Sequence, residues 1–155
     1  RENADIAGEM SGHIFYKYKY YGYDDAIYAS LKLIKIINDE KSKLSDLIEP
    51  YIKSSSTPEI KLYCDESMKF NLLNEIITKL KKSYQKDTLI DIDGIRIESE
   101  DFWFLIRASN TQNCLVFRLE HFKKKQLKEE LENLITIFDK FDLDISELNS
   151  FHNAI

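Results

Sequence analysis

One short polar segment, RASNT at residues 107–111, has the side chains that an anion-binding loop needs. Arg107 carries a planar guanidinium whose fork of donors matches phosphate oxygens. Ser109, Asn110 and Thr111 add side-chain donors, and a tight loop can turn several backbone N–H groups towards one anion. The residue types therefore indicate a phosphate-binding loop, although serine and asparagine are also ordinary turn residues.

A second polar segment, GEMSGH, runs from Gly8 to His13. Gly8 and Gly12 permit unusual backbone angles. If the segment is extended, Glu9 and Ser11 lie on one side of it. A carboxylate and a hydroxyl on one side suit adjacent hydroxyls of a sugar. The alternative is a polar turn between two strands, in which the histidine is structural.

The first half of the chain is predicted to contain a few short elements, which would position the GEMSGH segment. We expect a strand at residues 14–18, a helix with Ile27, Leu31 and Ile34 on one face after a cap at Asp24 or Asp25, and a shorter helix at 44–52. The Ser-rich stretch KSSSTPE follows these helices. Serines next to a proline are typical of a linker.

The second half has a regular pattern of strands and two amphipathic helices. The expected elements are a strand at 59–64, a helix at 66–85, a hairpin within 88–99 turned at Asp93-Gly94, two strands around a loop at 108–113, and a helix at 123–141. Consecutive hairpins predict an antiparallel sheet, and the two helices would cover one face of it. The fold class is therefore α+β.

Composition restricts the remaining classes of function. A net charge of −5 argues against a protein that binds nucleic acid by neutralising phosphates, even though tyrosines and lysines alternate at residues 16–23. The basic run at 122–126 is interpreted as a solvated patch. No apolar run approaches the roughly 20 residues needed to cross a bilayer. Cys64 and Cys114 have no metal-binding spacing, and the same is true of the histidines His13, His121 and His152.

Taken together, the segments occur in a recognisable order. GEMSGHIFYKYKYYGYDD is followed by STPEI, DGIRI, RASNT and RLE. This order resembles the C-terminal part of the α-D-phosphohexomutases, specifically the phosphomannomutase/phosphoglucomutase group, over roughly residues 4 to 122. Asn110 favours this group over the phosphoglucosamine mutases, which generally carry glycine there. The lack of a starting methionine also suggests a piece of a longer protein.

The resemblance implies a domain division and roles for the two loops. Residues 1–53 would end the third, α/β domain, 54–58 would be a hinge, and 59–155 would be the fourth domain, with a TATA-binding-protein-like sheet and helices. The loop Glu9-Met10-Ser11, with His13, would bind sugar hydroxyls. The second loop would bind the phosphate that is not transferred, through Arg107, Ser109, Asn110 and Thr111. Arg118, further along the strand, would support that loop.

The resemblance also implies an activity for the parent protein. It would be a cytoplasmic isomerase that interconverts hexose 1-phosphates and 6-phosphates of mannose or glucose through a phosphoserine and a bisphosphate intermediate. Its serine loop and its Mg²⁺ loop lie outside this chain, in N-terminal domains that are the chain's expected partners. The acidic stretch at 91–94 is interpreted as a hairpin turn rather than a metal loop. We therefore expect the chain alone to be inactive and to bind no metal, nucleic acid or membrane.

The chain departs from the family pattern at two places. Asn113 stands where proline is common, and Ala7 stands where a second glycine is usual. Neither change removes a contacting group, but both bear on loop rigidity. The alternative to a piece of an enzyme is a non-catalytic sugar-phosphate-binding or interaction domain derived from a mutase. Serine and aspartate loops in the parent reading frame would distinguish the two.

Overall fold

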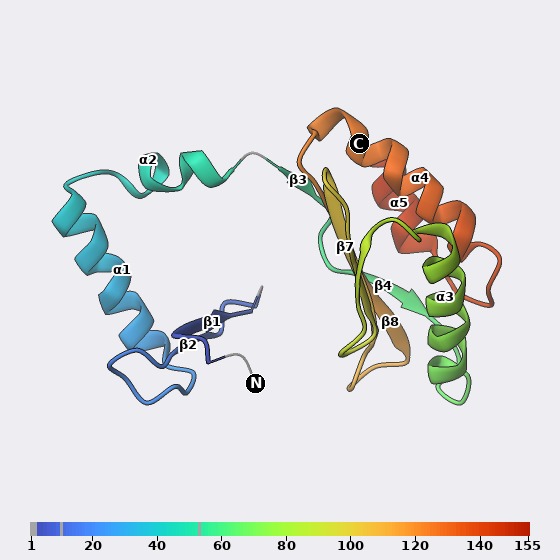
Figure 1. Ribbon diagram of the computed structural model, residues 1–155, viewed down its shortest axis with the longest axis horizontal. Coiled ribbons are helices and arrows are strands. Elements are labelled where there is room, and N and C mark those ends of the chain that lie inside the picture. The colour runs from blue at the N-terminus through green and yellow to red at the C-terminus, as the bar shows by residue number, and fades with distance from the viewer. Residues whose placement is uncertain (1–2, 10, 53) are drawn as a thin grey trace. The chain divides into compact units, whose positions relative to one another are not determined.

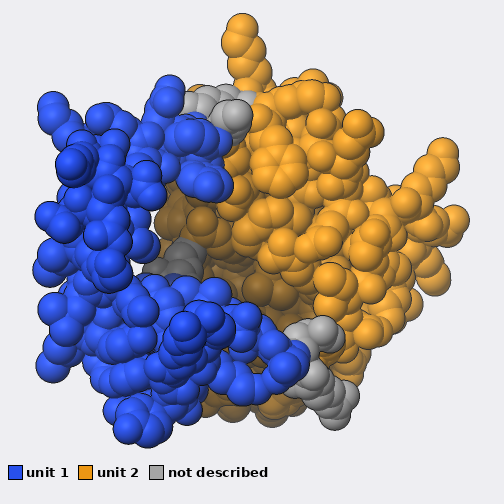
Figure 2. Space-filling model, turned by 60° about the vertical axis from the view of Figure 1, so that its left-hand side comes forward, with its two compact units in different colours: residues 1–52 blue, residues 53–155 orange. Residues whose placement is uncertain are grey.

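A computed structural model describes residues 3–9, 11–52 and 54–155 of the chain. Its internal contacts divide the chain into two compact units, unit 1 at residues 1–52 and unit 2 at residues 53–155, which Figure 2 shows in different colours. Each unit has a sheet of its own. The two polar loops identified from the sequence therefore belong to different units.

Unit 1 is a β-hairpin followed by helices (Figure 1). Its elements are β1 (Ile6–Gly8), β2 (Ile14–Tyr16), α1 (Ala26–Glu40), α2 (Leu44–Ile48) and the 3-10 turn η1 (Glu49–Tyr51). β1 and β2 pair antiparallel, with Ile6 opposite Tyr16. Asp25 caps α1, as expected, because its carboxylate accepts a hydrogen bond from the Tyr28 amide at 2.8 Å.

Helix α1 has the apolar stripe that its sequence predicts, but this stripe has no core to enter. Ile27, Leu31 and Ile34 are 77%, 60% and 61% exposed. None of the described residues of unit 1 is buried. An amphipathic helix gains most of its stability from burying such a stripe. Unit 1 therefore has the appearance of an incomplete domain.

Unit 2 contains a mixed set of strands and helices in the order β-α-β-β-β-β-α-α, after a short first strand. Its elements are β3 (Ser55–Ser56), β4 (Ile60–Tyr63), α3 (Lys69–Ser83), β5 (Thr88–Ile90), β6 (Ile95–Glu98), β7 (Phe102–Ala108), β8 (Cys114–His121), η2 (Lys124–Gln126), α4 (Leu127–Phe138) and α5 (Ser146–Ala154). The sheet runs β3-β8-β7-β6-β5, and β4 also pairs with β8. All its pairings are antiparallel, as predicted.

The core of unit 2 lies between one face of this sheet and the helices α3, α4 and α5, which lie on the same side of it (Figure 1). Alternate strand residues supply the sheet side of the core. In β7, for example, Phe104 and Ile106 are fully buried, while Trp103, Leu105 and Arg107 between them are only partly buried on the opposite face. This alternation places Arg107 on the face of the sheet away from the helices.

The structure corrects the sequence prediction at three places in unit 2. The last predicted helix begins at Leu127 rather than at residue 123, after the short turn η2. Helix α5 was not predicted, because Leu148 is its one fully buried residue and its periodic signal is weak. Part of the expected linker is a strand, since Ser55 and Ser56 pair with β8.

Candidate functional site

The RASNT segment forms a compact loop between β7 and β8. The Ser109 amide donates to the Cys114 carbonyl at 3.0 Å and so closes the base of the loop. Ser109 is only 8% exposed, and its Oγ accepts two further backbone hydrogen bonds, from Thr111 at 3.3 Å and from Gln112 at 3.2 Å. The hydroxyl therefore organises the loop from within.

This arrangement differs from the predicted one, in which several backbone N–H groups of the loop point towards one anion. The amides of Thr111 and Gln112 are committed to Ser109 Oγ rather than turned outwards. A hydroxyl oxygen that accepts two N–H groups keeps its own proton for a further acceptor. The side chains of Asn110 and Thr111 are exposed. The donors that the loop offers to an anion are thus chiefly side-chain groups.

Arg107 lies at the end of β7 next to this loop. Its side chain is 34% exposed, and its Nη1 lies 3.8 Å from Asp93 Oδ2. Asp93 belongs to the turn between β5 and β6, the hairpin that the Asp-Gly pair predicted. At 3.8 Å the pair is a loose ion contact rather than a hydrogen bond, so the guanidinium keeps donors for another ligand.

Lys69 lies behind the loop and was not identified from the sequence. It is the first residue of α3 and its side chain is only 4% exposed. Its ammonium group donates to the carbonyl oxygens of Ser109 at 2.9 Å and Gln112 at 3.2 Å, and to Glu66 Oε2 at 2.8 Å. The loop is therefore attached to α3 by a buried charged group.

The GEMSGH segment forms the tip of the β1–β2 hairpin, with Met10 outside the described residues. Glu9 and Gly12 close the tip, because the Gly12 amide donates to the Glu9 carbonyl at 3.0 Å and Gly12 adopts φ +92°. The tip is thus a turn between two strands, which is the alternative that the sequence left open to an extended segment. Even so, Ser11 Oγ donates to Glu9 Oε2 at 3.1 Å, so the predicted carboxylate and hydroxyl are brought together.

His13 contacts a carboxylate from the segment before α1. Its Nδ1 lies 2.5 Å from Asp24 Oδ2, and the other oxygen of Asp24 accepts the Ile14 amide at 3.3 Å. The hydrogen bond and the negative charge of Asp24 raise the pKa of His13 above its usual value. The histidine is therefore held in a fixed orientation at the base of the tip.

Three residues have contacts with the two loops that the sequence analysis did not predict: Lys69, Asp93 and Asp24. For Lys69 a signal did exist, because it precedes Leu72, Leu73 and Ile76 at the spacing of the buried stripe of α3. A lysine at a core position near a helix start implies a buried partner. The other two are visible only once the chain is folded, since each pairs across a strand or turn.

Arg118 makes no hydrogen bond to the loop at residues 107–111 in the described part of the chain. It lies on β8 opposite Leu105, and its Nη2 lies 3.4 Å from Ser56 Oγ. The supporting role expected for it is therefore limited to the edge strand. No group of three or more His, Cys, Asp or Glu side chains among the described residues is placed to hold a metal ion. Cys64 and Cys114 are both free thiols.

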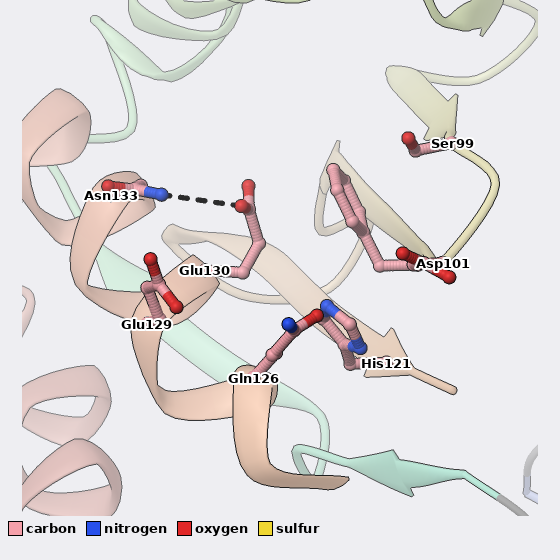
Figure 3. Close-up of a pocket in the computed structure, with 8 residues that line it drawn as sticks. Ser99, Asp101, His121, Gln126, Glu129, Glu130 and Asn133 are labelled. Atoms are coloured by element: carbon pink, nitrogen blue, oxygen red, sulfur yellow. Dashed lines mark hydrogen bonds between the residues drawn. The ribbon is translucent and has the colours of Figure 1, made fainter. Parts of the chain in front are cut away.

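A pocket of about 230 Å³ lies at the other end of the β7–β8 hairpin (Figure 3). Asp101, His121, Glu129 and Glu130 are among its lining residues, and Asn133 donates to Glu130 at 3.3 Å. None of the residues predicted to bind ligand lines it. No described helix is both long enough and apolar enough to cross a membrane.

Comparison with known proteins shows the same family over both units. The family description "Phosphoglucomutase/phosphomannomutase, alpha/beta/alpha domain III" matches residues 1–54. The description "Phosphoglucomutase/phosphomannomutase, C-terminal domain" matches residues 59–137. The second match covers β4 to nearly the end of α4 and therefore includes the loop after Arg107.

Individual relatives agree with the family descriptions. A phosphomannomutase/phosphoglucomutase of Pseudomonas syringae pv. tomato is 39% identical over 89% of this chain and 28% of its own length. One of Pseudomonas aeruginosa is 36% identical over 86% of this chain and 27% of its own length. A crystal structure of a phosphoglucomutase/phosphomannomutase family protein from Burkholderia thailandensis has a TM-score of 0.73 and 29% identity, over 88% of this chain and 28% of that one. The chain thus spans little more than a quarter of these relatives.

Proposed function

The chain belongs to the phosphoglucomutase/phosphomannomutase family, and from this premise we propose that it is the substrate-holding C-terminal part of a phosphohexomutase. Unit 2 would grip the phosphate group that is not being transferred, and unit 1 would bind sugar hydroxyls. The parent enzyme would interconvert hexose 1-phosphates and 6-phosphates. The observation that carries the proposal is the Ser109-centred loop with Arg107 at its base.

The phosphate clamp follows from the donors at this loop. Arg107 offers two parallel N–H donors to the oxygens of a phosphate, and its loose pairing with Asp93 keeps it oriented without satisfying it. Ser109 already accepts two amides, so its hydroxyl proton is available to a phosphate oxygen. Asn110 and Thr111 add exposed side-chain donors on the same loop. Such charge-assisted hydrogen bonds are the strong ones in anion sites.

The sugar-binding tip suits a substrate that must be held in two orientations. Glu9 accepts hydrogen bonds and Ser11 both donates and accepts, so together they match two neighbouring hydroxyls. We propose O3 and O4 as these hydroxyls. A double phosphoryl transfer needs a bisphosphate that turns over between the two steps, and a loop that reads O3 and O4 accepts both orientations. Because mannose and glucose differ at C2, this loop would not separate them.

The phosphoryl transfer itself would use groups outside this chain. In this proposal a Mg²⁺ ion of the parent enzyme would be held by its N-terminal domains. A phosphoserine there would supply the phosphoryl group. Residues 54–58 would form the hinge between the two domains, although Ser55 and Ser56 pair with β8. The chain alone would therefore bind ligand weakly and turn over none.

A chemical-shift titration of the 155-residue chain tests this proposal. Glucose 1-phosphate and mannose 1-phosphate should each shift the amides of residues 109–111 in a saturable way. Arg107→Ala should abolish these shifts because it removes the bidentate donor. Arg118→Ala is the matched control, since this arginine bonds to Ser56 on the edge strand. Shifts that persist in Arg107→Ala, or that disappear in both variants, would contradict the clamp.

A further inference from the structure

The lysine behind the phosphate loop has a position that helix physics disfavours. Lys69 is the first residue of α3, where the positive end of the helix dipole repels a cation. Its side chain is also only 4% exposed, so its charge has lost most of its hydration. A buried cation in such a place requires compensating contacts. These contacts are with the loop.

The ammonium group has three acceptors for its three N–H donors. Two of them, the carbonyl oxygens of Ser109 and Gln112, lie at the two ends of the turn, and the third is the Glu66 carboxylate. The Gln112 carbonyl also accepts the Cys114 amide at 2.9 Å. Lys69, which is buried, thus holds both ends of the loop to α3, whereas Asn110 and Thr111 of the loop are exposed.

One of these bonds sets the direction of a backbone donor. In a trans peptide the C=O and N–H groups point in opposite directions. Because Lys69 holds the Ser109 carbonyl towards α3, the N–H of the same peptide, that of Asn110, points away from α3. The exposed side chain of Asn110 lies on the outer part of the same loop. A cation on the carbonyl also polarises the peptide and strengthens its N–H as a donor.

We propose that Lys69 is a positioning residue for the phosphate loop, which it orders before ligand arrives and whose Asn110 N–H it directs at the bound phosphate. This inference rests on the proposed function of the loop as a phosphate clamp. Glu66 has a different role: its carboxylate, at 54% side-chain exposure, pairs with the ammonium group of Lys69 and balances its charge.

Two measurements on the 155-residue chain test the proposal: amide hydrogen exchange without ligand, and the affinity for inorganic phosphate and for glucose 1-phosphate. Lys69→Met keeps the apolar stem and removes the donors. It should speed exchange at residues 109–114 by about tenfold or more and weaken both ligands by about tenfold, because the loop loses its preorganisation. Glu66→Gln keeps an oxygen acceptor for Lys69 and leaves the carbonyl bonds in place, so it should change both measurements clearly less than Lys69→Met does.

Lys69→Arg covers the case in which Lys69→Met fails to fold. It keeps the buried charge, but its planar fork cannot reproduce three divergent bonds. A folded Lys69→Arg should therefore show an intermediate loss in both measurements. Unchanged exchange and unchanged affinity in whichever variant is folded would overturn the proposal. If the unmodified chain binds neither ligand, the clamp fails in this chain, while the exchange rates alone still decide whether Lys69 orders the loop.

Discussion

Gly94 lies directly against the backbone of Arg107. Gly94 has φ +76°, and a Cβ added to it would lie 2.7 Å from Arg107 Cα and in contact with the Ile106 carbonyl oxygen. The turn between β5 and β6 therefore packs on the strand that carries Arg107, the proposed phosphate-binding residue. The same turn supplies Asp93, which is the ion partner of Arg107. Together with Lys69 on α3, this turn supports the proposed phosphate loop from a second direction.

Gly94→Ala should therefore damage the clamp as well as the fold. The positive φ alone costs a residue with a side chain about 1–2 kcal/mol, and the overlap with Arg107 Cα forces the strands apart. We expect a loss of more than about 2 kcal/mol in the free energy of unfolding, together with displaced amide resonances at residues 106–109. Denaturant unfolding and an NMR spectrum of the 155-residue chain measure both effects.

Gly22→Ala is the matched control for this change. Gly22 has nearly the same backbone angle, φ +78°, but its added Cβ would meet only ordinary contacts, the nearest at 3.7 Å from Lys17 Cβ. It therefore reports the conformational cost without the overlap. If Gly94→Ala left the resonances around Arg107 where they are, the packing of Gly94 on that strand would not position the arginine.

Thr57 should be the anchor of the expected hinge. Its Oγ1 accepts the buried Leu119 amide at 3.0 Å, and its own amide donates to the Leu119 carbonyl at 2.9 Å. Thr57→Ala would leave that amide without an acceptor, at a cost of about 1–3 kcal/mol. Thr57→Val should be equally harmful despite its similar volume, whereas Thr57→Ser should stay close to the parent chain. Denaturant midpoints compare the three, and equal stability of the valine and serine variants would refute the role.

The sequence predicted the structure correctly where the residue pattern and the chemistry of neighbouring residues agree. The Asp93-Gly94 turn and the loop after Arg107 lie at their predicted positions, and the alternation in β7 places the arginine on the face away from the helices. It did not predict the role of a residue that acts through a contact with a distant segment of the chain. Lys69 is forty positions from Ser109 in the chain, and no periodicity connects a helix start to a loop on another strand.

Local pattern also failed where one residue type permits two conformations. Glycine at position 12 is compatible with an extended segment and with a turn. The structure has the turn, which is closed by the hydrogen bond from the Gly12 amide to the Glu9 carbonyl. The predicted neighbours, Glu9 and Ser11, still meet, because a tight turn brings residues two positions apart together as an extended strand does. Helix α5 was not predicted because Leu148 is its only buried residue, so the periodic signal in its sequence is weak.

His13 should titrate above its usual pKa of 6.5, because Asp24 favours the protonated ring. A raised folded-state pKa means that the ion pair stabilises unit 1 fully below about pH 6.5 and that this contribution is lost as the pH rises through the folded-state pKa. Asp24→Asn should bring the pKa of His13 back towards 6.5. Glu9→Gln is the control, since Glu9 is the smallest of the groups that raise it. An NMR titration of the imidazole protons in which Asp24→Asn changes nothing would rule out this pairing.

Truncation of Leu148 should destabilise the chain much more than truncation of Leu31, because Leu148 is buried in a core and Leu31 is not. Leu148 in α5 is fully buried, and beside it Glu147 accepts the Lys61 amide at 3.0 Å on the outer edge of β4. Leu148→Ala should cost about 2–5 kcal/mol. Leu31 in α1 is 60% exposed, so Leu31→Ala should cost no more than about 0.5 kcal/mol. The fluorescence of Trp103, the one tryptophan of the chain, follows unit 2 during denaturant unfolding, and circular dichroism follows the helices of both units. An unchanged midpoint in Leu148→Ala would mean that α5 is not part of the cooperative core, whereas a large loss in Leu31→Ala would mean that the stripe of α1 is already covered in this chain.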